Sequence, residues 1–288
     1  MSVTGLQVKR IWRFDKLNNK MIIGKKEFDV KQHTYIMGIL NVTPDSFSDG
    51  GNYNHIDKAL FRVETMIKEG MDILDVGGES TRPGYQMITE EEEIERVVPV
   101  IEAVRRRFEV PVSLDTYKAK VAQAGIIAGA DMINDIWGLL YDKDMAEVVA
   151  QSNVACCLMH NRKEAAYKDF MEDVKADLYK SLEVAEQAGI RKERIMLDPG
   201  VGFGKTYEQN LEVIRCVGKL QSLGYPVLLG TSRKSVIGLT LDLPVEKRLN
   251  GTLATSAYGI MQGCSFVRVH DIKEHRELIK MLEAIMSI

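Results

Sequence analysis

Short apolar runs alternate along this chain with longer segments of helical period. From residue 34 onward, runs rich in Ile, Val and Leu are each followed by a segment whose apolar residues recur every three or four positions. Near-continuous apolar character is typical of parallel strands covered on both faces, and the longer spacing is typical of amphipathic helices. The eight runs lie at residues 34–42, 72–78, 111–116, 131–136, 154–160, 194–200, 226–232 and 265–271.

Eight strand–helix units in about 240 residues predict a (β/α)8 TIM barrel of the α/β class. A doubly wound parallel sheet is the alternative architecture. The count of eight, and the absence of a GxGxxG motif after the first run, favour the barrel. Because LNNK and IGKKE resemble turns between short apolar runs, we expect residues 1–33 to form an N-terminal β-hairpin cap. The catalytic barrel domain is then expected over residues 34–288.

The composition excludes several classes of protein. The 288 residues are 45% apolar and 27% charged, which is typical of a globular protein, and the net charge of −3 offers no basic footprint for nucleic acid. No apolar run reaches the length of a membrane helix, and the first residues lack the apolar core of a secretory signal. The four cysteines have no metal-ligand spacing, so we expect buried, reduced thiols in a cytoplasmic protein, with Cys156 and Cys157 on opposite faces of a strand.

Polar residues follow each apolar run at its C-terminal end. In a barrel these ends share one rim, where barrel active sites form. One polar strand end is explained by a helix cap or a loop hydrogen bond, but carboxylates, amides and cations together indicate a site. The rim residues are Asn41, Asp75, Glu79, Asp115, Asn134, Asp135, His160, Asn161, Asp198, Ser232, Arg233, Lys234, Arg268, His270 and Asp271.

The rim residues fall into two chemical classes. Asp115, Asn134 and Asp198 are acceptors or amides that suit a flat heterocycle with an amino group beside a ring N–H. The second class is basic and favours an anion such as phosphate. Its members are Arg82, Arg233, Lys234, Arg268 and His270. His160 is expected to orient loops or to touch the site only indirectly.

Two loops near the rim contain further candidates. Asn41, Asp45 and Asp49 offer hard oxygen ligands that suit Mg²⁺, an ion that usually keeps several waters and also binds phosphate oxygens of the substrate. Turns explain the two aspartates without a metal, but they do not explain an amide inside an apolar run. STRPG at residues 80–84 is a second Gly/Pro loop, and the two loops together resemble a movable lid. DPGVGFGKT at 198–206 lacks the GxxxxGK[ST] spacing, which argues against a nucleoside triphosphate site.

These motifs resemble the dihydropteroate synthase family of folate biosynthesis. The resemblance rests on MGILNVTPDSFSDGG, DVGGESTRPG, SLDTYK, NDIWG, LMHNR, LDPGVGFGKT, LLGTSRKS and RVHD, which occur in the family's order over residues 34–271. It implies a pterin-binding transferase in which the amine of p-aminobenzoate displaces diphosphate from 6-hydroxymethyl-7,8-dihydropterin diphosphate. The product is 7,8-dihydropteroate, and the implied route is dissociative, through a pterin carbocation.

The resemblance implies how the pterin is held. Asp198, with Asn134 beside it, is expected to bind the amino-pyrimidine edge. Asp115 is expected near the opposite ring nitrogens, where its charge stabilises the developing cation. Lys234 is expected to hydrogen-bond the pterin carbonyl and a ring nitrogen, and Arg268 to stack on the pterin face while reaching toward the diphosphate.

The resemblance also implies the remaining contacts. Asn41, His270 and Mg²⁺ are expected to hold the leaving diphosphate. The residues expected around p-aminobenzoate are Phe47, Asp49, Thr81, Arg82, Pro83 and Ser235. Because the substrate amine attacks, no side-chain nucleophile is needed. The residues expected to be catalytic are Asp49, Asp115, Lys234 and Arg268. The family resemblance further implies a homodimer, and sulfonamides, which mimic p-aminobenzoate, are expected to compete for its site.

Three other functions are weighed against this one. A pterin-binding methyltransferase shares the barrel and the pterin edge, but it does not need TPDSFSDGG, TSRKS and RVHD. A non-catalytic binding or regulatory barrel does not need the full set of Asn41, Asp115, Lys234, Arg268 and His270. A Schiff-base aldolase is disfavoured because Lys234 follows an arginine beyond a strand end rather than lying within a strand.

Overall fold

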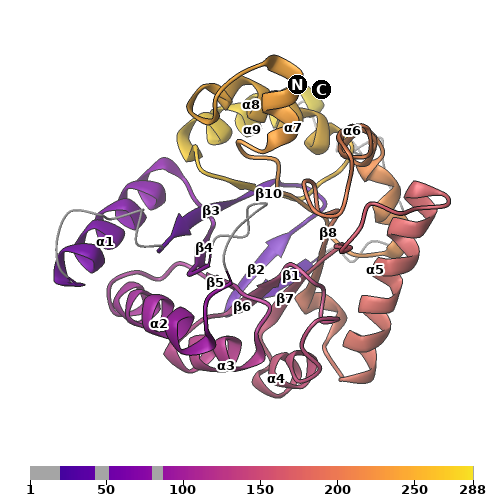
Figure 1. The fold of residues 1–288 in the computed structure, drawn as a ribbon. Coiled ribbons are helices and arrows are strands. Elements are labelled where there is room, and N and C mark those ends of the chain that lie inside the picture. The colour runs from indigo at the N-terminus through magenta and orange to yellow at the C-terminus, as the bar shows by residue number, and fades with distance from the viewer. Residues whose placement is uncertain (1–19, 43–51, 80–86, 288) are drawn as a thin grey trace, which may run out of the picture.

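The computed structural model describes residues 20–42, 52–79 and 87–287. Eight parallel strands form one sheet in the order β8-β7-β6-β5-β4-β3-β10-β9. A bridge between Leu197 and Val227 brings the segment before β9 against β8, so the sheet curls into a nearly closed ring. This order confirms the (β/α)8 barrel and rules out the doubly wound sheet, whose strand order reverses. Figure 1 shows the helices surrounding the strands.

Each of the eight predicted runs contains one strand. The strands are β3 Tyr35–Asn41, β4 Ile73–Gly77, β5 Val112–Asp115, β6 Met132–Asp135, β7 Ala155–Met159, β8 Ile195–Asp198, β9 Leu228–Leu229 and β10 Phe266–Val269. β9 is much shorter than the predicted run at 226–232. Its following residues turn away from the ladder, and the hydroxyls of Thr231 and Ser232 bond to Thr255 and His270 instead.

Nine helices are described around the ring. They are α1 Asn52–Glu69, α2 Glu90–Arg107, α3 Ala119–Ala128, α4 Met145–Ser152, α5 Phe170–Gln187, α6 Tyr207–Arg215, α7 Ser235–Leu241, α8 Leu249–Met261 and α9 Ile272–Met286. Short 3₁₀ turns lie at η2 Lys192–Arg194, η3 Val217–Leu223 and η4 Val245–Lys247. Within the described ranges, no helix combines the length and apolar character that a bilayer crossing requires.

Alternate residues of the strands point out toward the helices and into the barrel. The outward residues, Leu74 and Val76 among them, join the large cluster between strands and helices. The inward residues form a second, smaller cluster that includes Ile73 and Phe266. Cys156 lies in the outer cluster and Cys157 in the inner one, as predicted. All four cysteines are free, but Cys216 is only half-buried, because it lies at the exposed junction of α6 and η3.

An antiparallel hairpin closes the lower end of the barrel, which is the end where the parallel strands begin. β1 Lys20–Ile23 and β2 Lys26–Asp29 pair across a turn in which Gly24 has a φ of +57°. The Phe28 ring lies 4.8 Å from Tyr35 and 5.8 Å from Phe266, ring centroid to centroid, at the first residues of β3 and β10. The predicted hairpin is therefore present, and it shares the inner apolar cluster with the strands. The boundary at residue 33 stays a prediction, and residues 1–19 lie outside the described chain.

Candidate active site

The barrel interior changes from apolar to polar along each strand. Because strand side chains alternate, the residues two positions beyond the apolar inner cluster also point inward. On four strands these residues are polar: Asp75, Asn134, Asp198 and Arg268. Three of them are less than 5% exposed, and the Arg268 side chain keeps 19% of its surface exposed. A polar layer therefore lies above the inner apolar cluster, which forms an apolar plug. Its cation, Arg268, can be reached from the mouth, the open end of the barrel at the carboxyl ends of the strands.

Arg268 lies between two carboxylates. Its Nε donates to Asp75 Oδ2 over 2.6 Å, and its Nη2 donates to Asp115 Oδ2 over 2.6 Å. Asn134 Nδ2 donates to the same Asp75 oxygen over 3.3 Å. Burial raises the pKa of Asp115, and the like charge of Asp75 adds to that rise, while the Arg268 charge opposes it. Burial alone would lower the pKa of Arg268, but the two carboxylates outweigh burial and hold it above its ordinary value.

Asp198 and Lys234 face the same space from the other side. A Cβ added at Gly230 would lie 3.6 Å from Asp198 Oδ2, 3.8 Å from Arg268 Cβ and 3.9 Å from Lys234 Nζ. These three side chains therefore surround a position that glycine leaves open. Lys234 is half-buried, but its Nζ turns inward, where it donates to Val201 O and lies 4.8 Å from the Phe203 ring centroid.

Burial shifts the pKa values of both these groups. It lowers the pKa of Lys234 to about 8, against the opposing effect of the Asp198 charge. It raises the pKa of Asp198, while the Lys234 charge and the Gly200 N–H, 2.7 Å from Asp198 Oδ1, favour the ionised form. The site can thus present a carboxylate and an ammonium to one ligand near neutral pH.

Asn41 lies at the upper edge of the same mouth. A Cβ at Gly77 would lie 3.7 Å from Asn41 Oδ1 and 3.8 Å from Asp115 Oδ2, so the two oxygens flank one open position. Across the described ranges, no cluster of three or more His, Cys, Asp or Glu could hold a metal by itself. One amide oxygen fits Mg²⁺, because that ion keeps waters and takes substrate phosphate oxygens rather than needing an all-protein cage.

His270 lies at the end of β10 beside the turn after β9. Its N–H donates to Ser232 Oγ over 3.3 Å, and Ser232 Oγ lies 2.9 Å from His270 Nδ1. The serine hydroxyl that accepts from the main chain can donate to Nδ1, which leaves the ring proton on Nε2. Arg233, which the sequence assigns to the anion-binding class, makes a two-point pair with Asp271 at 2.5 and 3.2 Å. Arg233 therefore links the segments that follow β9 and β10, and its place in the anion-binding class stays a prediction.

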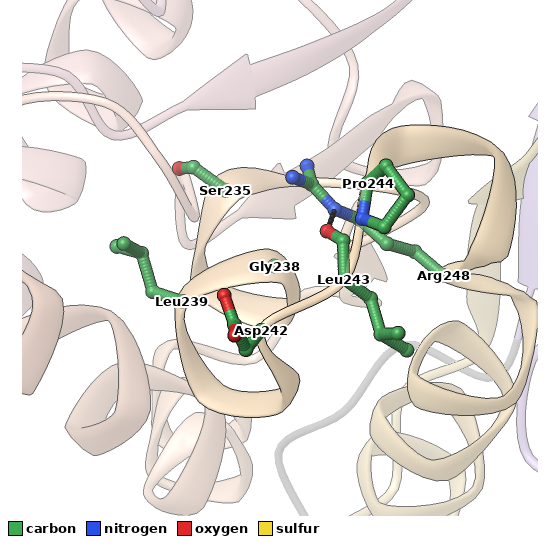
Figure 2. Close-up of a pocket in the computed structure, with 7 residues that line it drawn as sticks. All are labelled: Ser235, Gly238, Leu239, Asp242, Leu243, Pro244 and Arg248. Carbon is green, nitrogen blue, oxygen red and sulfur yellow. Dashed lines mark hydrogen bonds between the residues drawn. The ribbon is translucent and has the colours of Figure 1, made fainter.

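Ser235 opens α7 and is exposed. It borders a pocket of about 430 Å³ that is also lined by Gly238, Leu239, Asp242, Leu243, Pro244 and Arg248. In Figure 2 it lies at one edge of this pocket, on the first turn of the helix. The other predicted p-aminobenzoate residues, Phe47, Asp49, Thr81, Arg82 and Pro83, lie outside the described residues, as does Asp45.

The glycine-rich segment after β8 packs on the main chain that follows β7. A Cβ at Gly200 would lie 1.8 Å from His160 O, and one at Gly204 would lie 2.2 Å from Arg162 O. Both glycines have positive φ, +68° and +54°, which other residues rarely adopt. Only glycine therefore fits these two positions, and the segment holds Val201 O where Lys234 uses it.

Lys205 holds the glycine-rich segment after β8 in place through its side-chain ammonium group. Its Nζ lies 2.8 Å from His160 Nδ1, 2.9 Å from Gly200 O and 3.0 Å from Phe203 O. Burial lowers the pKa of Lys205 to about 7 and that of His160 to about 3, so the imidazole is neutral. His160 thus supports the loop, in line with its expected indirect role. Lys205 was not predicted from the sequence, because the GKT triplet indicates only part of a phosphate-binding loop, whose spacing is incomplete here.

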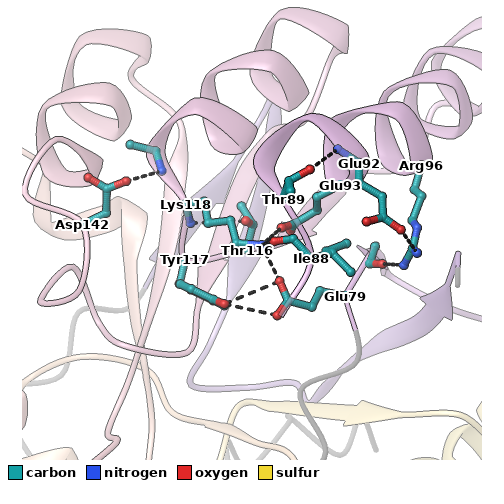
Figure 3. A network of polar contacts seen from close by, with 12 residues as sticks. Glu79, Ile88, Thr89, Glu92, Glu93, Arg96, Thr116, Tyr117, Lys118 and Asp142 are labelled. Carbon is teal, nitrogen blue, oxygen red and sulfur yellow. Dashed lines mark hydrogen bonds and ion pairs between the residues drawn. The ribbon is translucent and has the colours of Figure 1, made fainter. Parts of the chain in front are cut away.

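A buried lysine links the residues on either side of segment 80–86. Lys118 Nζ lies 2.5 Å from Glu79 and 2.7 Å from Glu93, and it donates to Ile88 O over 2.9 Å (Figure 3). Tyr117 donates to Glu79 over 3.2 Å. Because Lys118 follows Asp115 by three residues, this network also anchors the end of β5. Glu79 was placed at the rim from the sequence, but its lysine partner was not.

The chain resembles known proteins over most of its length. The family model described as pterin binding enzyme matches residues 37–270. The dihydropteroate synthase of Clostridium beijerinckii is 60% identical over 267 residues, which cover 92% of this chain and 99% of that protein.

Two solved structures share the fold. That of dihydropteroate synthase from Clostridium difficile in the presence of pteroic acid has a TM-score of 0.88 and 51% identity, over 90% of this chain and 98% of that one. That of Yersinia pestis dihydropteroate synthase with a sulfonamide drug has a TM-score of 0.86 and 40% identity, over 93% and 99%. Family match, identity and coverage agree, so this chain belongs to the pterin-binding enzymes and, among them, to the dihydropteroate synthases.

Proposed function

We propose that this protein condenses 6-hydroxymethyl-7,8-dihydropterin diphosphate with p-aminobenzoate to give 7,8-dihydropteroate and diphosphate. The observation that carries the proposal is the convergence of Asp115, Asp198, Lys234 and Arg268 around the open positions at Gly77 and Gly230. The solved complex of a relative with pteroic acid supports it, because that ligand joins a pterin to a p-aminobenzoyl group.

The buried acceptors suit the pterin. Asp198 and Asn134, both 4% exposed, offer acceptors to the amino group and ring N–H of the amino-pyrimidine edge. Lys234 Nζ would lie 3.9 Å from a Cβ at Gly230, beside Asp198, and this ammonium group suits the pterin carbonyl. A ligand that left these charged groups without hydrogen-bond partners would bind weakly, because their desolvation would not be compensated. The site therefore favours ligands with this donor–acceptor pattern.

The charges suit a dissociative reaction. As the bond to diphosphate breaks, negative charge grows on the leaving group and positive charge on the pterin methylene. Arg268 lies toward the mouth, where its charge can neutralise the diphosphate, and His270 can donate to the diphosphate from Nε2, while Asp115 can stabilise the cation. Asn41 would hold Mg²⁺, which supplies charge neutralisation to the phosphate oxygens when bound. The p-aminobenzoate amine then attacks the cation, with Ser235 and the five loop residues named above as its proposed binding residues.

The overall reaction is tested with purified protein, both substrates and Mg²⁺. We expect dihydropteroate and diphosphate to form in equal amounts, and turnover to slow strongly when a chelator removes the metal, because the leaving charge is then less well neutralised. Full activity in excess chelator would contradict the metal role. Failure to release diphosphate in the presence of p-aminobenzoate would contradict the function, and a pterin-dependent methyl transfer would replace it.

Asp198→Ala should weaken binding of the pterin substrate by about 100-fold or more, because buried ligand donors then lose a charged acceptor. Calorimetric titration measures the affinity, and a thermal melt checks the fold. Asp198→Asn, which keeps one acceptor, should lose less. The exposed Asp144, at the start of α4, provides a control substitution to Ala that should leave the affinity unchanged. Equal affinities of wild type and Asp198→Ala for the pterin substrate would contradict the assignment of Asp198 to pterin binding.

The rate should depend on pH in a bell shape. Lys234 must be protonated to donate, and its pKa is lowered to about 8, so kcat/KM should fall above about pH 8. Asp198 must be ionised, and its pKa is raised, so kcat/KM should also fall on the acid side, at a higher pH than an ordinary aspartate would give. Lys234→Arg should move the alkaline limb upward. An unmoved limb would contradict its assignment to Lys234.

We also propose a cytoplasmic homodimer that sulfonamides inhibit in competition with p-aminobenzoate. The helices α6, α7 and α8 pack on one another and expose several large apolar side chains, which suits an interface. They are Leu211, Leu239, Leu241, Tyr258 and Met261. Sedimentation equilibrium should give twice the mass of one chain, and a charged substitution, Leu239→Glu, should give monomers. A monomeric wild type at micromolar concentration would contradict the dimer.

A further inference from the structure

One buried carboxylate has no role in the reaction outlined above. Asp75, in the middle of β4, is fully buried, and the alternation of that strand points it into the barrel. Its register partner on β5 is Ser113, whereas Asp115 is the partner of Gly77, two residues closer to the rim. Asp75 therefore lies one layer deeper than Asp115, below the space that the substrate would fill.

Asp75 contacts two of the proposed substrate-binding residues through one oxygen. Its Oδ2 accepts from Arg268 Nε over 2.6 Å and from Asn134 Nδ2 over 3.3 Å. These bonds fix the plane of the guanidinium and the rotation of the amide. The Nη groups of Arg268 and the Oδ1 of Asn134 are then left for groups above them.

The two carboxylates that bind Arg268, those of Asp75 and Asp115, lie at different positions relative to the substrate. Asp115 lies at the rim and is proposed to face the pterin cation, so substrate competes for its bond to Arg268 Nη2. Asp75 lies beneath the substrate and has no such competition. When Asp115 turns to the substrate, Asp75 is the carboxylate that still holds the arginine.

A purely structural role explains Asp75 poorly. A buried ion pair is often no more stabilising than apolar residues of the same volume, so it is weak evidence of stabilisation. Within the described residues, Asp75 Oδ1 has no hydrogen-bond partner, although burying an unpaired carboxylate oxygen is costly. The remaining use of this charge is to orient the groups bound to Oδ2.

We propose that Asp75 is a positioning residue for the reaction, resting on the function proposed above, and that it holds Arg268 and Asn134 in their productive orientations while substrate is bound. Asp75 touches neither substrate and acts through these two residues. Its removal should therefore slow the chemical step more than it changes p-aminobenzoate binding.

The first test is the variant Asp75→Asn, with Ser113→Ala as the matched control from the same barrel layer. Asp75→Asn should lower kcat by about 10- to 100-fold and leave the KM for p-aminobenzoate within about two-fold, because the lost interaction matters in the transition state. Ser113→Ala should leave kcat within about two-fold. Unchanged kcat in Asp75→Asn, or an equal loss in Ser113→Ala, would overturn the proposal.

A double-mutant cycle separates positioning from general damage. In an Arg268→Ala background, Asp75→Asn should lower kcat by a much smaller factor than it does in wild type, because the shorter of the two contacts of Asp75, that with Arg268, is already lost. Additive losses would indicate damage to the barrel and would overturn the proposal. If wild type itself releases no diphosphate, the proposed function fails first, which distinguishes the two failures.

A measurement on the wild-type protein tests the contact between Asp75 and Arg268 directly. The Nε–H of Arg268 should give a slowly exchanging NMR signal, assigned by its absence from Arg268→Ala. This signal should persist when pteroic acid is added, because the bond to Asp75 is kept. Its loss to rapid exchange in the complex would show that Asp75 does not hold the arginine.

Discussion

The site depends on the cost of burying charge inside a barrel. An arginine, two lysines and three aspartates lie in or beside the upper half of this interior, and a buried charge is tolerated only when it has partners. Arg268 meets this condition with Asp75 and Asp115, and Lys205 meets it with main-chain carbonyls and His160. The shape of the mouth follows from these pairings, because each one fixes where a side chain points before any ligand arrives.

The lower half of the barrel provides the surroundings that make those charges effective. Phe28 from the hairpin and Phe266 from β10 fill the strand ends with aromatic rings and exclude water there. Above this plug, burial shifts the pKa values of Asp198 and Lys234 toward each other, from opposite directions. Apolar packing and acid–base behaviour are thus two results of the same architecture, and the proposed cation chemistry relies on both.

Hydrophobic periodicity predicted the barrel because the two periods differ clearly along the chain. Strand parity correctly separated Cys156 from Cys157. Parity says which residues face inward, but it does not say which charges pair. Arg268 and Asp75 are 193 residues apart, and only the pairing of β10 and β4 with β3 brings their side chains within 2.6 Å. The partner of Glu79 at Lys118, the short β9 and the use of Arg233 by Asp271 were unpredictable for the same reason, since each depends on contacts between distant segments.

The tight packing of the segment after β8 also limits how the protein can evolve. Gly200 and Gly204 have no tolerated replacement, because any side chain would collide with the carbonyls of His160 and Arg162. The main-chain atoms between them cannot be removed by substitution at all. Sequence change at this end of the barrel is therefore expected among the side chains around the mouth, while the path of the main chain from Gly200 to Gly204 stays the same.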